Sequence, residues 1–213
     1  LELGNIDEST LRPVSTPCID DHQIPAEEHE APGKLAPCAA QIVLKILFLA
    51  RRSRPDIYWT TNALSRKVAK WTQACDRRLH RLVCFIYATK HWMLESYVGD
   101  SPENCSLVWF ADADFAGDLE DSKSTSGGYL IVVGPRTFAP IAWLCKKQTA
   151  VSKSSTEAEV IALDAGMRLE AIPCLFLWEQ IILALAPPNK ERLEQCQKVL
   201  QSSDWKPISD LYT

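Results

Sequence analysis

The spacing of apolar residues divides the chain into a helical part and a later part that contains strands. Apolar positions three and four residues apart predict helices over residues 38–52, 56–70 and 75–91. The first helix is expected to end before Pro55, because the residue that precedes a proline resists the helical backbone conformation. Residues 1–34 hold four prolines and no sustained periodicity, so they are expected to form an acidic linker or tail with little order.

The periodicity changes after residue 105. A continuous apolar run over residues 107–111 predicts a central strand that ends in Asp112. Residues 129–133 and 137–143 flank a Gly-Pro-Arg turn and predict a hairpin. Because a helix follows the strand and the hairpin, this part of the chain is predicted to be an α/β domain.

The helix after the hairpin begins with hydroxyl and acidic side chains. Ser154 and its neighbours can cap the first turn, and Glu157 and Glu159 suit its positive end. The helix is predicted to run past Leu169. Pro173 should kink or break it before a further helical stretch over residues 174–185.

The net charge of −4 is distributed unevenly along the chain. Residues 1–34 carry −6, residues 35–98 carry +8, residues 99–186 carry −6, and residues 187–213 carry no net charge. The positive block is interleaved with tryptophans and could hold a phosphate backbone. An amphipathic helical bundle with a solvated basic face would give the same pattern.

The composition is that of a globular protein that stays inside the cell. The 213 residues are 46% hydrophobic and 23% charged, which suits one domain or two small ones. No apolar run reaches the roughly 18 residues that cross a bilayer, and the first 30 residues lack the features of a secretory signal. Eight cysteines without a C-x-x-C pair suit reduced thiols. We therefore expect no membrane contact and an intracellular location, in the cytoplasm or the nucleus.

Two carboxylates stand where a metal site could form. Phosphodiester hydrolysis by two magnesium ions needs carboxylates from different elements around ions about 3.5–4 Å apart. Asp112 at the end of the central strand and Glu159 in the following helix fit this need. Helical arithmetic places Glu159 on the side of the small residues Ala162 and Gly166, whereas Glu157 falls on a solvated side. Acids at a strand end and a helix start are also ordinary turn and dipole features.

Four sequence motifs follow one another in this second half. They read FADADFAGD at residues 110–118, SKSTSGGY at 122–129, IAWLCKKQ at 141–148 and SSTEAE at 154–159. In order and spacing they resemble the ribonuclease H domain of copia-type retrotransposon polyproteins. The chain departs from the usual family pattern at Ala111, Phe115, Gly128, Leu144, Cys145 and Val160.

The resemblance reaches back through the basic block and covers about residues 35–186. It implies an acidic, proline-containing linker or tail (1–34), a basic helical connection segment of reverse transcriptase (35–98), a ribonuclease H-like domain (99–186) and a C-terminal tail of uncertain relation (187–213). The implied fold is an α/β ribonuclease H-like mixed sheet with packed helices. The catalytic aspartates of the polymerase would lie upstream, so no DNA synthesis is expected.

The resemblance also implies an activity, which is hydrolysis of the RNA strand of RNA–DNA hybrids. Asp112 and Glu159 would hold Mg²⁺, with Mn²⁺ as an alternative ion. The implied partners are the hybrid or another nucleic acid and the rest of the polyprotein. Basic side chains expected to contact the nucleic-acid backbone are Arg66, Lys67, Lys70, Arg77, Arg78, Arg81, Lys146 and Lys147.

The third and fourth carboxylates of the family are not recognisable in this sequence. Asp204 and Asp210 lie in the tail, but neither follows an apolar strand. Two alternatives to an active nuclease therefore stay open. The chain could be a non-catalytic remnant that still binds nucleic acid, or it could be a protein-interaction module.

Overall fold

The computed structural model describes residues 7–117 and 121–185. The first half contains three helices, α1 (Ala36–Arg52), α2 (Tyr58–Ser65) and α3 (Gln73–Ala88), with a 3₁₀ turn at Pro55–Ile57. The three predicted helices are confirmed in number and order. The second helix is shorter than predicted, because the chain turns after Ser65 on its way to α3.

One buried cluster holds α1, α2 and α3 together as a helical block. Val43 on α1, Leu64 on α2 and Leu79 on α3 are all at most 2% exposed. Complete burial of such a side chain stabilises the fold by about 1.5–3 kcal/mol. The apolar stripes that predict the helices are therefore the surfaces that pack together.

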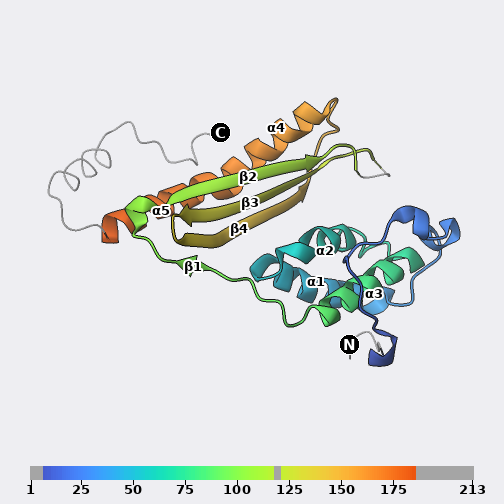
Figure 1. Ribbon diagram of the computed structural model, residues 1–213. Coiled ribbons are helices and arrows are strands. Elements are labelled where there is room, and N and C mark those ends of the chain that lie inside the picture. Colours follow the sequence, from blue (N-terminus) through green and yellow to red (C-terminus); the bar gives the residue numbers. More distant parts are fainter. Residues whose placement is uncertain (1–6, 118–120, 186–213) are drawn as a thin grey trace.

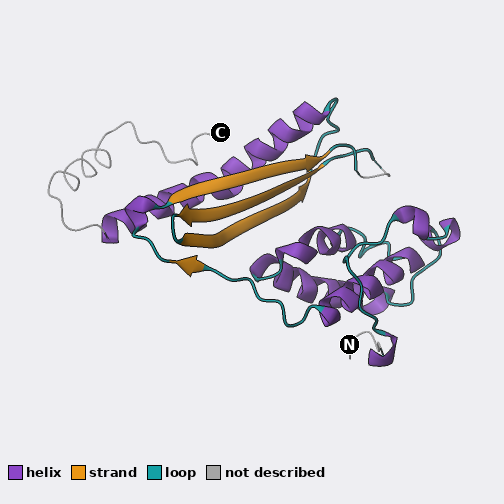
Figure 2. Cartoon of the chain, viewed as in Figure 1, coloured by secondary structure: helices purple, strands orange, loops and turns teal. Residues whose placement is uncertain are grey.

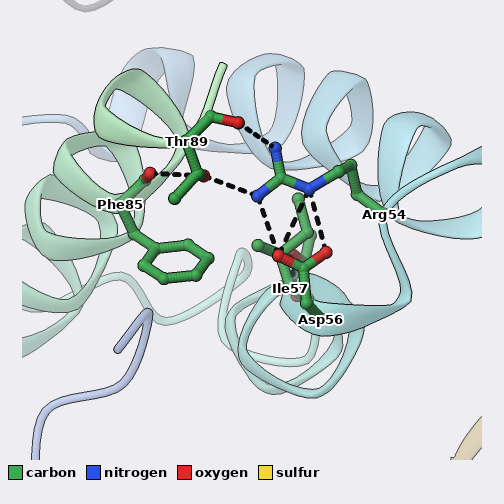
Figure 3. A network of polar contacts seen from close by, with 6 residues as sticks. Arg54, Asp56, Ile57, Phe85 and Thr89 are labelled. Atoms are coloured by element: carbon green, nitrogen blue, oxygen red, sulfur yellow. Dashed lines mark hydrogen bonds and ion pairs between the residues drawn. The ribbon is translucent and has the colours of Figure 1, made fainter. Parts of the chain in front are cut away.

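A buried arginine joins the end of α1 to the end of α3 (Figure 3). Arg54 is 7% exposed and donates from Nε and Nη2 to the Asp56 carboxylate, with Nη2–Oδ2 at 2.8 Å. It also donates to Thr89, from Nη1 to the carbonyl oxygen at 3.1 Å and from Nη2 to Oγ1 at 2.6 Å. The rings of Phe85 and Trp92 lie within 6 Å of the guanidinium. This network fixes the chain that leads into α2.

Four strands form one sheet in the order β1–β4–β3–β2. They are β1 (Tyr97–Val98), β2 (Ser106–Asp114), β3 (Thr125–Gly134) and β4 (Thr137–Lys147). All the described pairs are antiparallel, so the prediction of a mixed sheet is wrong for the described residues. A parallel neighbour needs a crossover connection, and no described strand follows the last helix. Within the described residues, β2 forms one edge of the sheet.

A long helix with one irregular turn follows the sheet. It consists of α4 (Ser155–Gly166), a π-helical turn (Met167–Ala171) and α5 (Ile172–Leu185). At its start Ser154 Oγ accepts the Glu157 amide at 3.1 Å, while the Glu157 carboxylate accepts the Lys153 amide at 2.6 Å. The helix continues through Pro173. Because proline has no amide hydrogen to donate, the wider π turn before it accommodates the missing bond.

The helices lie on both sides of the sheet. Figure 1 shows α4 and α5 along one face and the helical block beyond the other, and Figure 2 shows the same division into helices and strands. Trp109 packs under α4, since a methyl group added to Gly166 or Gly128 would lie 1.9 or 2.1 Å from its ring. Side chains alternate along a strand, so Asp112 points to the opposite face, toward the helical block.

The acidic N-terminal segment lies against α3 (Figure 1). Residues 7–34 form three 3₁₀ turns, at Glu8–Thr10, Asp21–Gln23 and Ala26–His29. Leu11 and Ile24 of this segment are only 9% and 5% exposed. For residues 7–34 the expected lack of order is therefore not observed, because polar contacts with α3 hold the segment and Val14 packs against the core of the helical block.

Two further expectations concern the C-terminal tail and membrane-spanning helices. The predicted tail over residues 187–213 lies outside the described residues. Among the helices that the structure describes, none combines the length and the apolar character needed to cross a membrane.

Candidate active site and nucleic-acid interface

A cleft of about 260 Å³ lies between α2 and the sheet. Tyr58 and Trp59 of α2 line one side, and Tyr129 and Trp143 of the sheet line the other together with Asp112. The two sheet aromatics stack with ring centroids 6.1 Å apart. The cleft therefore combines flat apolar surfaces from both parts of the chain with a carboxylate.

Two hydrogen bonds hold the two sides of this cleft in place. The indole Nε1 of Trp143 donates to the carbonyl oxygen of Ala50 at 2.8 Å. The side-chain amide of Asn62 on α2 donates to the carbonyl oxygen of Cys145 on β4. The helical block and the sheet thus touch through specific polar contacts as well as through aromatic rings.

Asp112 is an exposed carboxylate on β2 that opens into the cleft. In the described part of the chain it makes no hydrogen bond or ion pair, and its backbone pairs with Gly127 of β3. The strand does not end there as predicted but continues to Asp114. The carboxylate of Asp114 accepts the amide of Thr125, so this second acid fastens the end of the β2–β3 ladder.

Glu159 lies in the second turn of α4 and its side chain is exposed. The residues that α4 buries against the sheet are Ala158, Ala162 and Gly166. They follow one another at intervals of four residues, and Glu159 lies beside this row. The predicted solvated side is confirmed, because Asp164 and Arg168 form an ion pair at 2.6 Å.

These positions define where a shared metal ion could lie. Asp112 points away from α4, whereas Glu159 projects from the flank of α4, so the two carboxylates belong to different sides of β2. In the described part of the chain, no three His, Cys, Asp or Glu side chains converge as metal ligands. The roles of Asp112 and Glu159 in metal binding stay predictions.

Three of the predicted basic residues face the N-terminal segment. Arg77 donates from Nε and Nη2 to the carboxylate of Glu28, with Nη2–Oε1 at 2.6 Å. Arg78 forms an ion pair with Asp21. Arg81 donates to the carbonyl oxygen and the hydroxyl of one threonine, Thr16, at 3.1 and 3.0 Å. In this structure the chain itself occupies these three guanidinium groups.

The other predicted basic residues lie elsewhere on the surface. Arg66 and Lys70 are exposed in the turn between α2 and α3, and Lys67 between them is half-buried. Lys146 is exposed on β4, and Lys147 forms an ion pair with Asp121 at 2.8 Å. Of the predicted contact residues, Arg66, Lys70 and Lys146 are thus exposed, whereas Arg77, Arg78, Arg81 and Lys147 are paired within the chain.

Burial disfavours the charged forms of three groups that surround the cleft. Desolvation by burial raises the pKa of Tyr58, of Tyr129 and of the Cys145 thiol above their ordinary values. All three would be neutral at neutral pH even without this shift. Sequence reasoning did not place Tyr58 or Trp59 at this site, because helical periodicity does not reveal which sheet residues an exposed helix face will meet.

Comparison with known proteins shows which proteins the chain is similar to. No protein-family model matches it, and no solved structure matches it. It is 31% identical over 180 residues to the retrovirus-related Pol polyproteins from the transposons RE1 and RE2 of Arabidopsis thaliana. These alignments cover 84% of the chain but 12% of each polyprotein.

A third relative is shorter. The secreted RxLR effector protein 161 of Plasmopara viticola is 33% identical over 118 residues, which cover 55% of the chain and 78% of that protein. The region shared with the Pol polyproteins is longer than the region shared with this effector protein. Its 180 residues are enough to include both the helical block and the sheet. The chain belongs to the family of copia-type retrotransposon Pol polyproteins, of which it represents one segment.

Proposed function

We propose that this segment is the ribonuclease H-like part of a Pol polyprotein together with the helical segment before it. Its reaction is hydrolysis of the RNA strand of an RNA–DNA hybrid. The observation that carries the proposal is Asp112, an exposed carboxylate in the FADAD motif that opens into a cleft between the two parts. An acid placed in this way can meet a bound substrate without breaking any existing contact of its own.

The substrate would be recognised by its shape. A hybrid presents 2′-hydroxyl groups and phosphates, so it can be distinguished from duplex DNA without contacts to base edges. Exposed lysines and arginines near the sheet and on the helical block supply the attraction to phosphates. Trp59, which is 47% exposed at the cleft, adds a flat apolar surface.

Magnesium is the ion that this donor chemistry suits, and manganese is an alternative. Mg²⁺ prefers oxygen ligands and commonly keeps several waters while it binds one or two carboxylates and substrate phosphates. Asp112 and Glu159 would be these carboxylates. Because the described residues supply no cluster of three ligands, we expect the chain by itself to hold the second ion of a two-metal site poorly and to cleave slowly or not at all.

The test compares the chain with an extended form. A segment from the RE1 polyprotein that follows the aligned region is fused after residue 213, and cleavage of a labelled RNA–DNA hybrid is followed with Mg²⁺. We expect the extension to raise the rate by orders of magnitude, and Asp112→Asn to abolish it. Asp164→Asn, which alters an ion pair on the solvated side of α4, is the matched control and should leave the rate unchanged. A folded extended chain that cleaves nothing, or that cleaves equally well with Asp112→Asn, would overturn the proposal.

A second candidate is a remnant that binds nucleic acid without cleaving it. The absence of a three-ligand cluster from the described residues favours this reading. It predicts salt-dependent binding of the hybrid with no metal-dependent cleavage, even after the extension. A protein-interaction module predicts instead association that is insensitive to salt, with no affinity for nucleic acid.

A further inference from the structure

The N-terminal segment is fastened to the start of α3 at its own end. The amide of Gly33 donates to the carbonyl oxygen of Trp71 at 3.1 Å, and the amide of Gln73 donates to that of Ala31 at 2.9 Å. A Cβ atom added at Gly33 would lie 2.5 Å from the carbonyl oxygen of Thr72. Only glycine therefore allows these two segments of the chain to approach so closely. The segment therefore reaches α3 in a defined register.

Acidic side chains of the same segment then pair with the arginines of α3, of which Arg77 keeps a side chain that is 51% exposed. Glu28 accepts two hydrogen bonds from Arg77 in a bidentate arrangement, and its side chain is 15% exposed. Asp21 pairs with Arg78, whose side chain is 21% exposed. Arginine binds carboxylates and phosphates through the same planar fork of donors. These carboxylates thus occupy positions that phosphate oxygens could take.

The contacts are of a kind that another anion can displace. Ion pairs near the surface contribute little individually and weaken with salt, whereas a nucleic acid presents a continuous row of phosphates. Val14 of the segment packs against the core of the helical block, and the backbone hydrogen bonds of Gly33 and Gln73 do not involve these ion pairs. Glu28 and Asp21 can therefore leave the arginines while the segment stays attached.

We propose that α3 carries a phosphate-binding face at Arg77 and Arg78, and that residues 7–34 mask it from within the chain. Nucleic acid then binds this face in competition with Glu28 and Asp21. The inference rests on the proposed function, since it adds regulation to the nucleic-acid binding of the same segment. It accounts for the opposite charges of residues 1–34 and residues 35–98, which are −6 and +8.

The test measures binding of a fluorescent RNA–DNA hybrid to the full chain by anisotropy at low salt. One variant removes the masking charges with Glu28→Gln and Asp21→Asn. Its matched control is Glu27→Gln with Asp20→Asn, which changes the net charge equally at neighbouring exposed positions. Because exposed ion pairs are modest, we expect the first variant to bind about three- to tenfold more tightly than the native chain and the control to bind within about twofold of it.

A second background shows whether the arginines carry the effect. With Arg77→Gln and Arg78→Gln in place, the substitutions at Glu28 and Asp21 should no longer change the affinity. Circular dichroism verifies that each variant is folded, and Glu28→Gln alone replaces the double variant if that one does not fold.

Each outcome decides the matter. Equal gains for the masking variant and its control would show a general effect of net charge and would overturn the mask. A native chain that binds, with the masking variant unchanged, would overturn the mask and leave the proposed function standing. If no variant binds the hybrid at any salt concentration, both the mask and the nucleic-acid binding in the proposed function are wrong.

Discussion

Replacement of Arg54 by alanine tests how the helical block is held together. The substitution removes the donors of every hydrogen bond that the guanidinium makes to Asp56 and Thr89 (Figure 3). It leaves the carbonyl oxygen of Thr89, a residue only 6% exposed, without this donor. Loss of one partner from a buried charged network costs about 3–5 kcal/mol. We therefore expect Arg54→Ala to lower the free energy of unfolding by that amount.

Two further substitutions extend the test. Asp56→Asn leaves the guanidinium of Arg54, whose side chain is 8% exposed, as a buried charge without its carboxylate, so it too should cost about 3–5 kcal/mol. Arg52 is exposed at the end of α1, and Arg52→Ala should change stability by less than about 0.5 kcal/mol.

Thermal and urea unfolding followed by circular dichroism measure these differences. For a chain of this size each kcal/mol shifts the melting temperature by about 2–4 °C, so Arg54→Ala should melt about 10 °C lower than the native chain. Arg54→Lys should recover only part of the loss, since lysine lacks the planar fork that reaches Asp56 and Thr89 together. If Arg54→Ala and Arg52→Ala unfold alike, the network does not stabilise the block and this reasoning is wrong.

Three further predictions follow from other contacts. The side-chain hydrogen bond from Arg77 lowers the pKa of Glu28 below its ordinary 4.5. The contact therefore stabilises the fold above about pH 4.5 and is lost as the pH falls through the lowered value. Hydrogen exchange of residues 7–34 should accelerate at this low pH, and Glu28→Gln should abolish this pH dependence. A methyl group at Gly166 would lie 1.9 Å from the Trp109 ring. Although alanine favours helices, Gly166→Ala should therefore lower the free energy of unfolding of the sheet domain in urea by about 1–3 kcal/mol. A stabilised variant would show that Trp109 does not pack there. Arg66→Gln with Lys70→Gln should reduce the slope of log affinity against log salt for duplex nucleic acid by at most about 1.8, and an unchanged slope would mean that this part of the basic block is only solvated.

Local signals in the sequence predict the elements well. The three helices of the block, the hairpin around the Gly-Pro-Arg turn and the capped start of α4 are all confirmed. Each depends on residues close together in the chain, such as Ser154 and Glu157 in the capping contacts. The bounds are less accurate, since β2 continues to Asp114 through pairing with Thr125 on the next strand.

Features that depend on distant residues could not be predicted in this way. The short strand β1 exists because Tyr97 pairs with Phe138, far along the chain. The cleft forms because α2 meets the sheet face that carries Tyr129 and Trp143. The position of the N-terminal segment on α3 was missed because its prolines and acids suggest solvation, whereas the arginines that attract it lie dozens of residues away.

The central proposal is that Asp112 and Glu159 hold one divalent ion, and a binding measurement tests it most directly. Electron paramagnetic resonance counts the Mn²⁺ bound by the chain in the presence of an RNA–DNA hybrid, whose phosphates complete the coordination. The account predicts a hybrid-dependent Mn²⁺ site that is lost in both Asp112→Asn and Glu159→Gln and retained in Asp164→Asn. A Mn²⁺ site that persists in Glu159→Gln, or no hybrid-dependent site at all, would contradict it.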